Sequence, residues 1–143
     1  MNIVKITSPS EILSNHEIAE LVGMSLFKST IGAVQNVAQG IYAQQQGRFY
    51  IAKDDDKIIG IIGMRKIANK RLVIQHLAFL EEYRGKGYVK IMMKEVCQLE
   101  HINEIAAEVN HTQKNYFKKS GFKVNLIENH ITGQDLYWCK KSF

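Results

Sequence analysis

The sequence predicts a fold that contains both helices and strands, α/β in the broad sense and α+β in the narrower one. Its central sheet should be mixed but mostly antiparallel, with helices on its flanks. Segments with strand-like and helix-like patterns follow one another in the order β-α-α-β-β-β-α-β-α-β-β. Three consecutive strands in this order are separated only by short turns, which is typical of antiparallel hairpins. The amphipathic helices before and after them can then cover the two faces of the sheet.

The composition is that of an ordinary globular protein. The chain has 143 residues, 45% of them hydrophobic and 23% charged, so we expect one folded domain over residues 1–143. No apolar run is long enough to cross a bilayer, and the start at Met1 lacks the pattern of a signal peptide. We therefore expect a cytoplasmic protein with no membrane partner.

Charge and cysteine usage narrow the possible partners. The net charge of +5 favours a polyanion, either nucleic acid or a phosphorylated cofactor. The basic residues are scattered and form no Arg/Lys cluster with interleaved aromatic residues, so we expect no nucleic-acid partner. Cys97 and Cys139 lie far apart, and no His cluster accompanies them, which predicts no metal site.

The first elements are a strand and two helices. Residues 3–7 are rich in β-branched side chains and predict a short strand. A helix should follow, with Ser8 as its cap, Pro9 in its first position and Glu11 completing a capping box. Later apolar residues continue this helix: Ile12, Leu13, Ala19, Leu21 and Val22. A second helix is expected over residues 31–46.

The middle of the chain predicts three strands in a meander. Residues 48–52 form the first, and the acidic segment 54–57 forms a turn after it. Residues 58–64 are apolar at nearly every position, which predicts a strand that is buried on both faces. After a turn at 68–70, a third strand is expected over 72–80.

The C-terminal part alternates helices with strands. A helix follows Gly87, because apolar residues recur there at helical spacing: Val89, Met92, Met93, Val96 and Leu99. Another helix is expected over 112–119, ended by Gly121 as a left-handed cap. The remaining strands are expected at 102–109, 122–127 and 136–138.

The strongest local signal lies between the strand 72–80 and the helix that follows it. This segment reads Arg84-Gly85-Lys86-Gly87-Tyr88-Val89. Glycines let the backbone approach a ligand closely, and the first amide groups of a helix have no internal acceptors. A pyrophosphate fits such a place, and Arg84 and Lys86 add positive charge beside it. The segment is neither a Walker loop nor a Rossmann fingerprint, since it lacks the closing Gly-Lys-Ser/Thr and follows a meander.

The same segment resembles the acetyl-CoA-binding signature of the GNAT superfamily of N-acetyltransferases. That pattern is Arg or Gln, two residues, Gly, one residue, then Gly or Ala; Arg84 and Gly87 match it, and Val89 stands where a small residue is usual. A second stretch resembles another motif of the family, with Asn110, an aromatic residue on the following helix, and then Gly121 before a phenylalanine. Both motifs occur in the family's order, and the order of elements matches the family fold.

The resemblance implies a function and a set of contacts. It implies an N-acetyltransferase that uses acetyl-CoA as cosubstrate and acetylates a primary amine of a small molecule or peptide. The backbone around Leu77 and Phe79 would hold the pantetheine arm. The residues implied in cofactor binding are Leu77, Phe79, Arg84, Gly85, Lys86, Gly87, Tyr88, Val89, Asn110 and Phe117. A homodimer is common in this family and is possible here.

The catalytic residues are less clear from the sequence. Many family members carry a tyrosine acid where this chain has Phe117, and Tyr116 lies about 100° away around the helix. This departure leaves open a non-catalytic acyl-CoA-binding regulatory domain. For the base, His76 on the strand leading to the glycines is the candidate, because histidine titrates near neutral pH. A hydrogen-bonded core histidine, Glu108 as the base, or a chain of waters are the alternatives.

Overall fold

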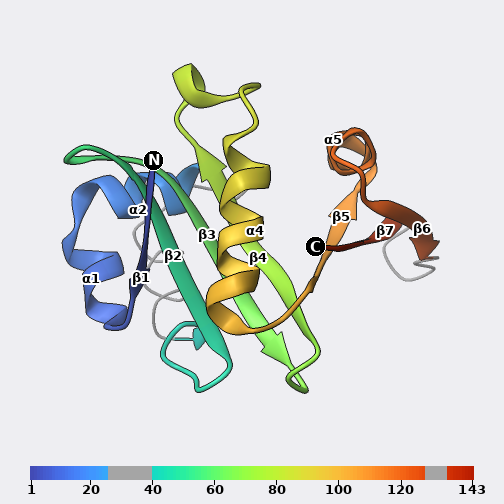
Figure 1. The fold of residues 1–143 in the computed structure, drawn as a ribbon, viewed down its shortest axis with the longest axis horizontal. Helices are drawn as coiled ribbons and strands as arrows, with labels where there is room; N and C mark the ends of the chain where they lie inside the picture. The colour runs from blue at the N-terminus through green and yellow to red at the C-terminus, as the bar shows by residue number, and fades with distance from the viewer. Residues whose placement is uncertain (26–39, 128–134) are drawn as a thin grey trace.

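The computed structural model describes residues 1–25, 40–127 and 135–143, and it shows the expected α+β architecture (Figure 1). Within these residues, seven strands form one sheet in the order β1-β2-β3-β4-β5-β7-β6. Every neighbouring pair is antiparallel except β4–β5, which is parallel. The strands are β1 (Asn2–Ile6), β2 (Gly47–Asp54), β3 (Lys57–Ile67), β4 (Arg71–Phe79), β5 (Glu104–Asn110), β6 (Lys123–Ile127) and β7 (Leu136–Ser142).

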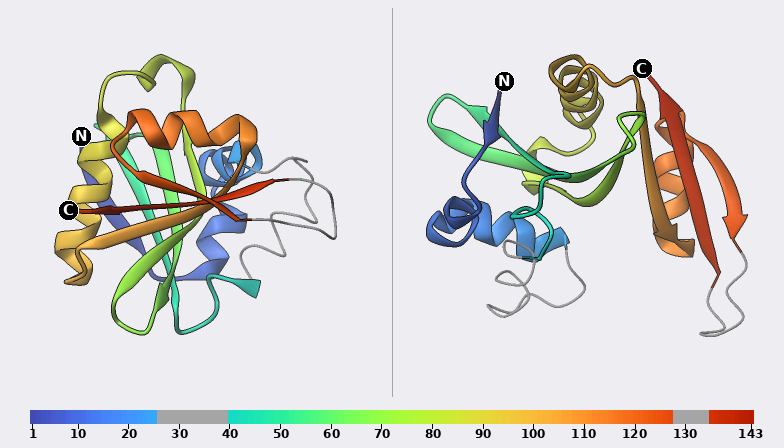
Figure 2. Two further views of the ribbon diagram at one scale, coloured as in Figure 1. Left: turned by 90° about the vertical axis from the view of Figure 1, so that its right-hand side faces the viewer. Right: turned by 90° about the horizontal axis from the view of Figure 1, so that it is seen from below.

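Helices cover both faces of the β1–β4 half of the sheet. The described helices are α1 (Pro9–Ser14), α2 (His16–Ser25), the short 3₁₀ helix η1 (Glu81–Tyr83), α4 (Tyr88–Glu100) and α5 (His111–Lys119). Figure 2 shows α1 and α2 on one face and α4 on the other. The C-terminal helix α5 packs against β5, β6 and β7.

The core has two parts because β3 is buried on both faces, as its continuous apolar sequence predicted. Ile59 and Ile62 belong to the part under α4, together with Met92 and Val96 of that helix. Ile61 packs instead into the part under α1 and α2, which includes Ile12, Ile18, Leu21 and Val22. The central meander is thereby held rigidly between two helical layers.

The N-terminal helix differs from the expectation. One helix from Ser8 through Val22 was expected, but the structure has two, because Asn15 takes an extended conformation between them. The Asn15 side chain accepts a hydrogen bond from the Ile18 amide at 3.2 Å and so begins α2. The expected capping box is also wrong, since the Ser8 side chain makes no capping bond.

Two further expectations have different outcomes. The helix expected over 31–46 falls largely outside the described residues, and residues 41–46 form turns and a bend rather than helix. The cap at Gly121 is confirmed, since this glycine has φ of 91° just after α5.

The sheet opens between β4 and β5. The parallel ladder has only three residue pairs, the last of which joins Ile74 to Ala107. Immediately afterwards β4 contains a bulge. Met64 of β3 pairs with Ile74 and the preceding Gly63 pairs with His76, so Gln75 has no partner residue in β3. A bulge bends its strand and increases the local twist. Figure 1 shows β4 and β5 separating toward their C-terminal ends.

Candidate functional site

A cavity of about 320 Å³ lies where β4 and β5 separate. Its size is within the range of sites for small molecules. We call it the β4–β5 cavity. It is lined by β4 residues 74–79, by Met24 and Ser25 at the end of α2, by Ala107, Glu108 and Val109 of β5, by Gln113, Tyr116 and Phe117 of α5, and by Arg84 and Val89.

The backbone of β4 forms one wall of this cavity. Beyond Ile74 it pairs with β3 on one side but makes no ladder with β5 on the other. An unpaired strand edge offers N–H and C=O groups to an extended ligand. Leu77 and Phe79 point their side chains toward the core under α4, while Ala78 points to the core under α1 and α2. The side chains of this stretch therefore pack, and its backbone faces the ligand space.

A glycine on β3 makes room for the Phe79 ring. Gly60 pairs with Phe79, and a Cβ atom there would lie 2.6 Å from three ring carbons. Glycine inside a strand often marks such a close approach. The position of Phe79 at the cavity wall therefore depends on a residue of the neighbouring strand.

The segment of residues 84–89, which we call the glycine loop, leads from η1 into α4. Gly85 and Gly87 have φ of 73° and 81°, a left-handed conformation that favours glycine. A Cβ atom at either position would meet no atom within 4 Å, so this backbone borders open space. The first helical bond of α4 runs from the Ile91 amide to the Gly87 carbonyl at 3.2 Å, and no side chain caps this end. The preceding amides are thus available to an anion.

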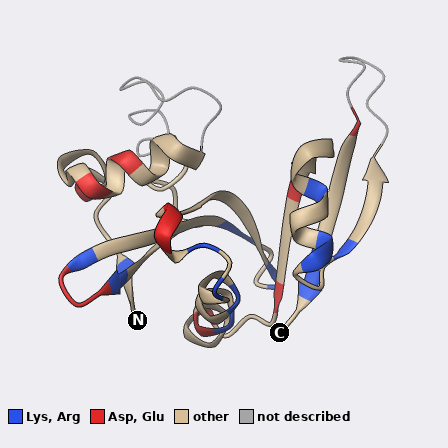
Figure 3. Ribbon diagram, turned by 90° about the horizontal axis from the view of Figure 1, so that it is seen from above, with Lys and Arg blue, Asp and Glu red and all other residues tan. Residues whose placement is uncertain are grey.

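The 3₁₀ helix η1, which precedes the glycine loop, is anchored to the adjoining ends of β2 and β3, and the loop itself is anchored to the end of β4. The Tyr83 hydroxyl donates to Asp54 at 2.8 Å, and the Lys57 ammonium pairs with Glu82 at 3.1 Å. Arg84 Nε donates to the carbonyl of the last β4 residue at 2.9 Å. Figure 3 shows basic residues between η1 and α4, next to the acidic residues of η1.

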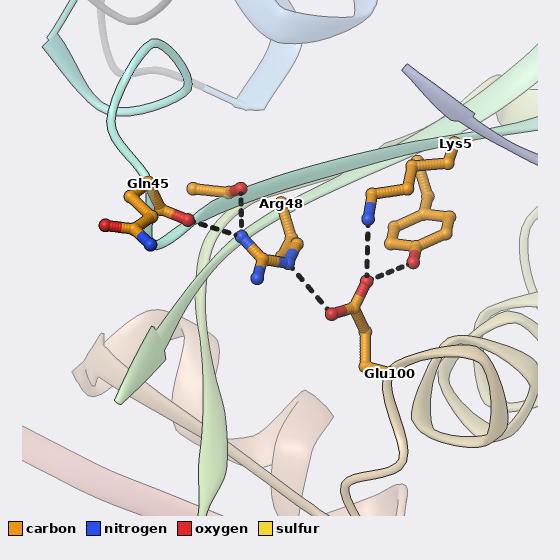
Figure 4. Close-up of polar contacts among 6 residues, drawn as sticks. Lys5, Gln45, Arg48 and Glu100 are labelled. Atoms are coloured by element: carbon orange, nitrogen blue, oxygen red, sulfur yellow. Dashed lines mark hydrogen bonds and ion pairs between the residues drawn. The ribbon is translucent and has the colours of Figure 1, made fainter. Parts of the chain in front are cut away.

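The far end of α4 is held by Glu100 (Figure 4). This carboxylate is only 8% exposed and contacts Arg48 Nε at 2.8 Å, Lys5 Nζ at 3.4 Å and the Tyr50 hydroxyl. Burial alone would raise the pKa of Glu100, but the hydrogen bonds from Tyr50 and Arg48 and the nearby positive charges bring the pKa below its usual range. The ion pairs fix α4 against β1 and β2, and so fix the direction in which its N-terminus points.

Asn110 has a structural role at the start of α5. Its side-chain oxygen accepts from the Gln113 amide at 2.9 Å, and the Gln113 side chain accepts from the Asn110 amide at 3.2 Å. This is a reciprocal capping box, which the Asn-x-x-Gln spacing in the sequence could have predicted. Gln113 lines the β4–β5 cavity, whereas Asn110 is not among its lining residues.

The aromatic pair on α5 reaches the cavity. Phe117 is 7% exposed and packs edge-on against Phe122, with ring centroids 5.1 Å apart. Tyr116 is 45% exposed and also lines the cavity, although helical phasing predicted that it would point elsewhere. Burial raises the pKa of Tyr116, so its hydroxyl stays protonated at neutral pH.

His76 is inside the cavity wall but is not a strong base. It is 5% exposed, and its Nδ1 atom lies 2.6 Å from the Tyr42 hydroxyl. Burial lowers the pKa of His76 to about 4, so the ring is neutral at pH 7. Glu108, the other candidate base, also lines the cavity and is exposed.

The structure brings part of the predicted site together. Five of the residues expected to bind cofactor line the cavity: Leu77, Phe79, Arg84, Val89 and Phe117. Gly85, Lys86, Gly87 and Tyr88 lie between two of these lining residues in the glycine loop. Tyr42 does not line the cavity but contacts His76, and this contact was not expected. The signal that could have indicated it is Gly63, where a Cβ atom would overlap the Tyr42 hydroxyl.

Two negative findings concern the described parts of the chain. Within them, no group of three or more His, Cys, Asp and Glu side chains could hold a metal ion. None of the helices described is long and apolar enough to span a membrane. Cys97 and Cys139 are buried free thiols, and burial raises the pKa of Cys97 to about 11.

Comparison with protein families gives one match. Residues 45–124, which are more than half of the chain, match the family described as an acetyltransferase (GNAT) domain. This region extends from the turn before β2 through the glycine loop and α5 into β6. No curated protein matches the sequence.

Solved structures share the fold over nearly the whole chain at low sequence identity. A GNAT family acetyltransferase from Elizabethkingia anophelis with acetyl-CoA bound has a TM-score of 0.70 at 14% identity, and the match covers 99% of this chain and 97% of that one. The aminoglycoside 6'-N-acetyltransferase from Enterococcus faecium has a TM-score of 0.72 at 13% identity, with 99% and 97% covered. PaiA N-acetyltransferase from Thermoplasma acidophilum in complex with coenzyme A has a TM-score of 0.65 at 18% identity, with both chains fully covered at 100%.

Proposed function

Because this chain belongs to the GNAT family of acetyltransferases, we propose that it transfers an acetyl group from acetyl-CoA directly to a primary amine of a small molecule or peptide. The observation that carries the proposal is the geometry where β4 separates from β5. A free strand edge, a cavity and the uncapped start of α4 follow one another there. Acetyl-CoA is an extended molecule with a thioester at one end and a pyrophosphate toward the other. It therefore matches these three neighbouring surfaces.

The cofactor would lie along β4 with its pyrophosphate in the glycine loop. The amides at the start of α4 and the positive end of its dipole would receive the phosphate oxygens. Arg84 and Lys86 would add charge, and the backbone of residues 77–79 would bond the pantetheine amides. Two similar structures are described with acetyl-CoA or coenzyme A bound, which supports the choice of cofactor.

Acetyl transfer requires a neutral amine and a thioester held in the right position. The amine nitrogen attacks the carbonyl carbon, the carbon–sulfur bond breaks, one proton leaves the nitrogen and one reaches the thiolate. A backbone N–H of β4 would stabilise the negative charge that develops on the carbonyl oxygen. Glu108, an exposed carboxylate that lines the cavity, or a water beside it would accept the amine proton.

The departure of the sulfur needs little help. A thiol with a pKa of about 8.5 is a good leaving group, so we expect the thiolate to leave without a side-chain acid. Phe117 lacks a hydroxyl, and a water can supply the proton. The amine would approach from the side of Met24 and Ser25, which line the cavity at the end of α2.

A second candidate is a non-catalytic acyl-CoA-binding regulatory domain. The observation that favours it is the buried Phe117, which stands where many relatives have a tyrosine acid. Such a domain would use the same cavity and glycine loop, but no amine would accept the acetyl group.

One experiment separates the two candidates. Calorimetric titrations with CoA and acetyl-CoA should show micromolar binding and a melting temperature that rises with ligand concentration. A panel of amines, followed by detection of free thiol, should then identify at least one acceptor. Binding without thiol release from any amine would favour the regulatory domain. Absence of binding at millimolar CoA would contradict both.

A further inference from the structure

The Tyr42–His76 pair is a buried contact that the proposed acetyl transfer does not use. Tyr42 is 8% exposed and contacts His76 from the turns that precede β2. The Tyr42 hydroxyl lies 2.6 Å from Nδ1, and the two ring planes are inclined at 63°. Gly63 lies opposite His76 in the β3–β4 ladder, and any side chain there would overlap the hydroxyl. The fold therefore makes room for this contact.

The direction of the hydrogen bond follows from the surroundings of the two rings. Burial raises the pKa of Tyr42 and lowers that of His76, so both groups are neutral near pH 7. Among the described residues, the Tyr42 hydroxyl has no hydrogen-bond partner besides His76. If the hydroxyl accepted a bond from Nδ1–H, its own buried hydrogen would lack an acceptor among the described residues, which is unfavourable. Tyr42 is therefore the donor, and the ring proton of His76 lies on Nε2.

His76 is one of the residues that line the β4–β5 cavity, whereas Tyr42 is not. The Nδ1 edge of the His76 ring faces Tyr42, which leaves the Nε2 edge to face the cavity. In the part of the chain that the structure describes, Nε2 has no protein partner. Its N–H group can then bond to a molecule in the cavity.

We propose that Tyr42 holds His76 in the Nε2–H form, so that His76 is a hydrogen-bond donor to an uncharged oxygen of a substrate. The oxygen belongs either to the acetyl group of the thioester or to a carbonyl or hydroxyl group of the amine substrate. An Nε2–H group has no lone pair with which to accept a proton, so His76 binds the substrate rather than acting as the base, and Tyr42 is the positioning residue. The identity of the ligand rests on the proposed function, whereas the tautomer does not.

The tautomer can be measured without any activity. Long-range ¹H–¹⁵N NMR correlations of the ¹⁵N-histidine-labelled protein distinguish a protonated ring nitrogen from an unprotonated one, and His76→Gln assigns the signals among the five histidines. We expect a protonated Nε2 and an unprotonated Nδ1 at pH 7. Tyr42→Phe removes the donor, and Gly63→Ala displaces the Tyr42 ring; each should introduce the Nδ1–H form. A protonated Nδ1 in the wild-type protein would overturn the proposal.

Two substitutions at His76 test its role in catalysis. A glutamine can place an N–H donor near the position of Nε2 but cannot act as a base, whereas a leucine offers neither. With an active amine from the panel, His76→Gln should stay within about threefold of wild-type kcat/KM, and His76→Leu should lose about tenfold, as expected for one hydrogen bond. Equal loss in both variants, with melting temperatures and CoA affinity intact, would indicate a base. Wild-type rates in both variants would also contradict the proposal.

Binding measurements identify which substrate supplies the oxygen. If it is the acetyl carbonyl, His76→Leu weakens acetyl-CoA binding while CoA binding is unchanged. If it belongs to the amine substrate, the KM for the amine rises and the ratio of acetyl-CoA to CoA affinity stays constant. A wild-type protein that neither binds acetyl-CoA nor releases thiol would contradict the proposed function, while the NMR result would still decide the tautomer.

Discussion

Arg84 Nε lies 2.9 Å from the carbonyl oxygen of Phe79, so the first residue of the glycine loop is tied to the last residue of β4. The two surfaces proposed for the cofactor, the strand edge and the loop, thus share one hydrogen bond. Arg84 both carries a positive charge and fixes the loop in place, whereas the exposed Lys86 two residues later contributes charge alone.

Replacing these two residues separates charge from position. Arg84→Met and Lys86→Met each remove one positive charge, but only the first also removes the bond to β4. A hydrogen bond to a charged group contributes about 1.5–3 kcal/mol, so Arg84→Met should weaken CoA binding about tenfold more than Lys86→Met does. Isothermal titration with CoA measures both. Equal losses would show that the bond to Phe79 does not position the loop.

Gly87 tests whether the glycine loop holds the pyrophosphate. Any side chain at its φ of 81° costs about 1–2 kcal/mol of stability, but a Cβ atom meets no neighbour within 4 Å. Gly87→Glu and its uncharged match Gly87→Gln should therefore lower the melting temperature equally. Only the glutamate adds a negative charge where the phosphates should lie, so Gly87→Glu should lose far more CoA affinity. Normal binding by Gly87→Glu would mean that the loop is only a turn.

The two aromatic residues of α5 test the need for an acid. Phe117→Tyr keeps the aromatic ring and adds one oxygen, so it should leave kcat unchanged or raise it modestly. Although Tyr116 lines the cavity, we expect the thiolate to leave without a side-chain acid. Tyr116→Phe should therefore cost less than about tenfold in kcat, which is below the range for a lost general acid. A loss of about a hundredfold, with CoA affinity intact, would show instead that Tyr116 protonates the leaving thiolate.

The lowered pKa of Glu100 predicts how the free energy of unfolding depends on pH. Its pKa is lowered in the folded protein, so its contribution is fully present above the ordinary glutamate value of about 4.3 and is lost as the pH falls below it. Glu100→Gln leaves Arg48 and Lys5 without their buried partner and should cost about 3 kcal/mol at pH 7.

Urea unfolding between pH 7 and pH 3 checks this prediction. The wild-type free energy of unfolding should fall more steeply below about pH 4.3 than that of Glu100→Gln. The exposed Glu11 offers a control, since Glu11→Gln should keep the wild-type pH profile. Parallel profiles for wild type and Glu100→Gln would contradict the role assigned to the buried carboxylate.

The sequence alone could predict the elements whose signals are local. The meander follows from short polar turns between apolar runs, and α4 follows from helical spacing after Gly87. The break at Asn15 could not be predicted, because the apolar pattern continues through it. The break depends on a single side chain, that of Asn15, which caps the start of α2.

The site was predictable only where it is made by consecutive residues. The glycine loop is such a segment, so Gly85 and Gly87 could be placed from the sequence. Tyr42 could not, because its contact with His76 spans 34 positions and depends on the pairing of β3 with β4. The neutral state of His76 likewise comes from burial, which depends on the tertiary fold.

The short ladder between β4 and β5 has a consequence for how the molecule opens. The junction between β4 and β5, which we call the seam, has three residue pairs, far fewer than the β3–β4 and β5–β7 ladders on either side. We therefore expect β5, α5, β6 and β7 to separate from β1–β4 before either part unfolds. In native-state hydrogen exchange, their amides should then share a lower opening free energy than those of β3. A molecule bound across the seam would contact both parts, and it would slow exchange throughout the C-terminal part, even at amides it never touches.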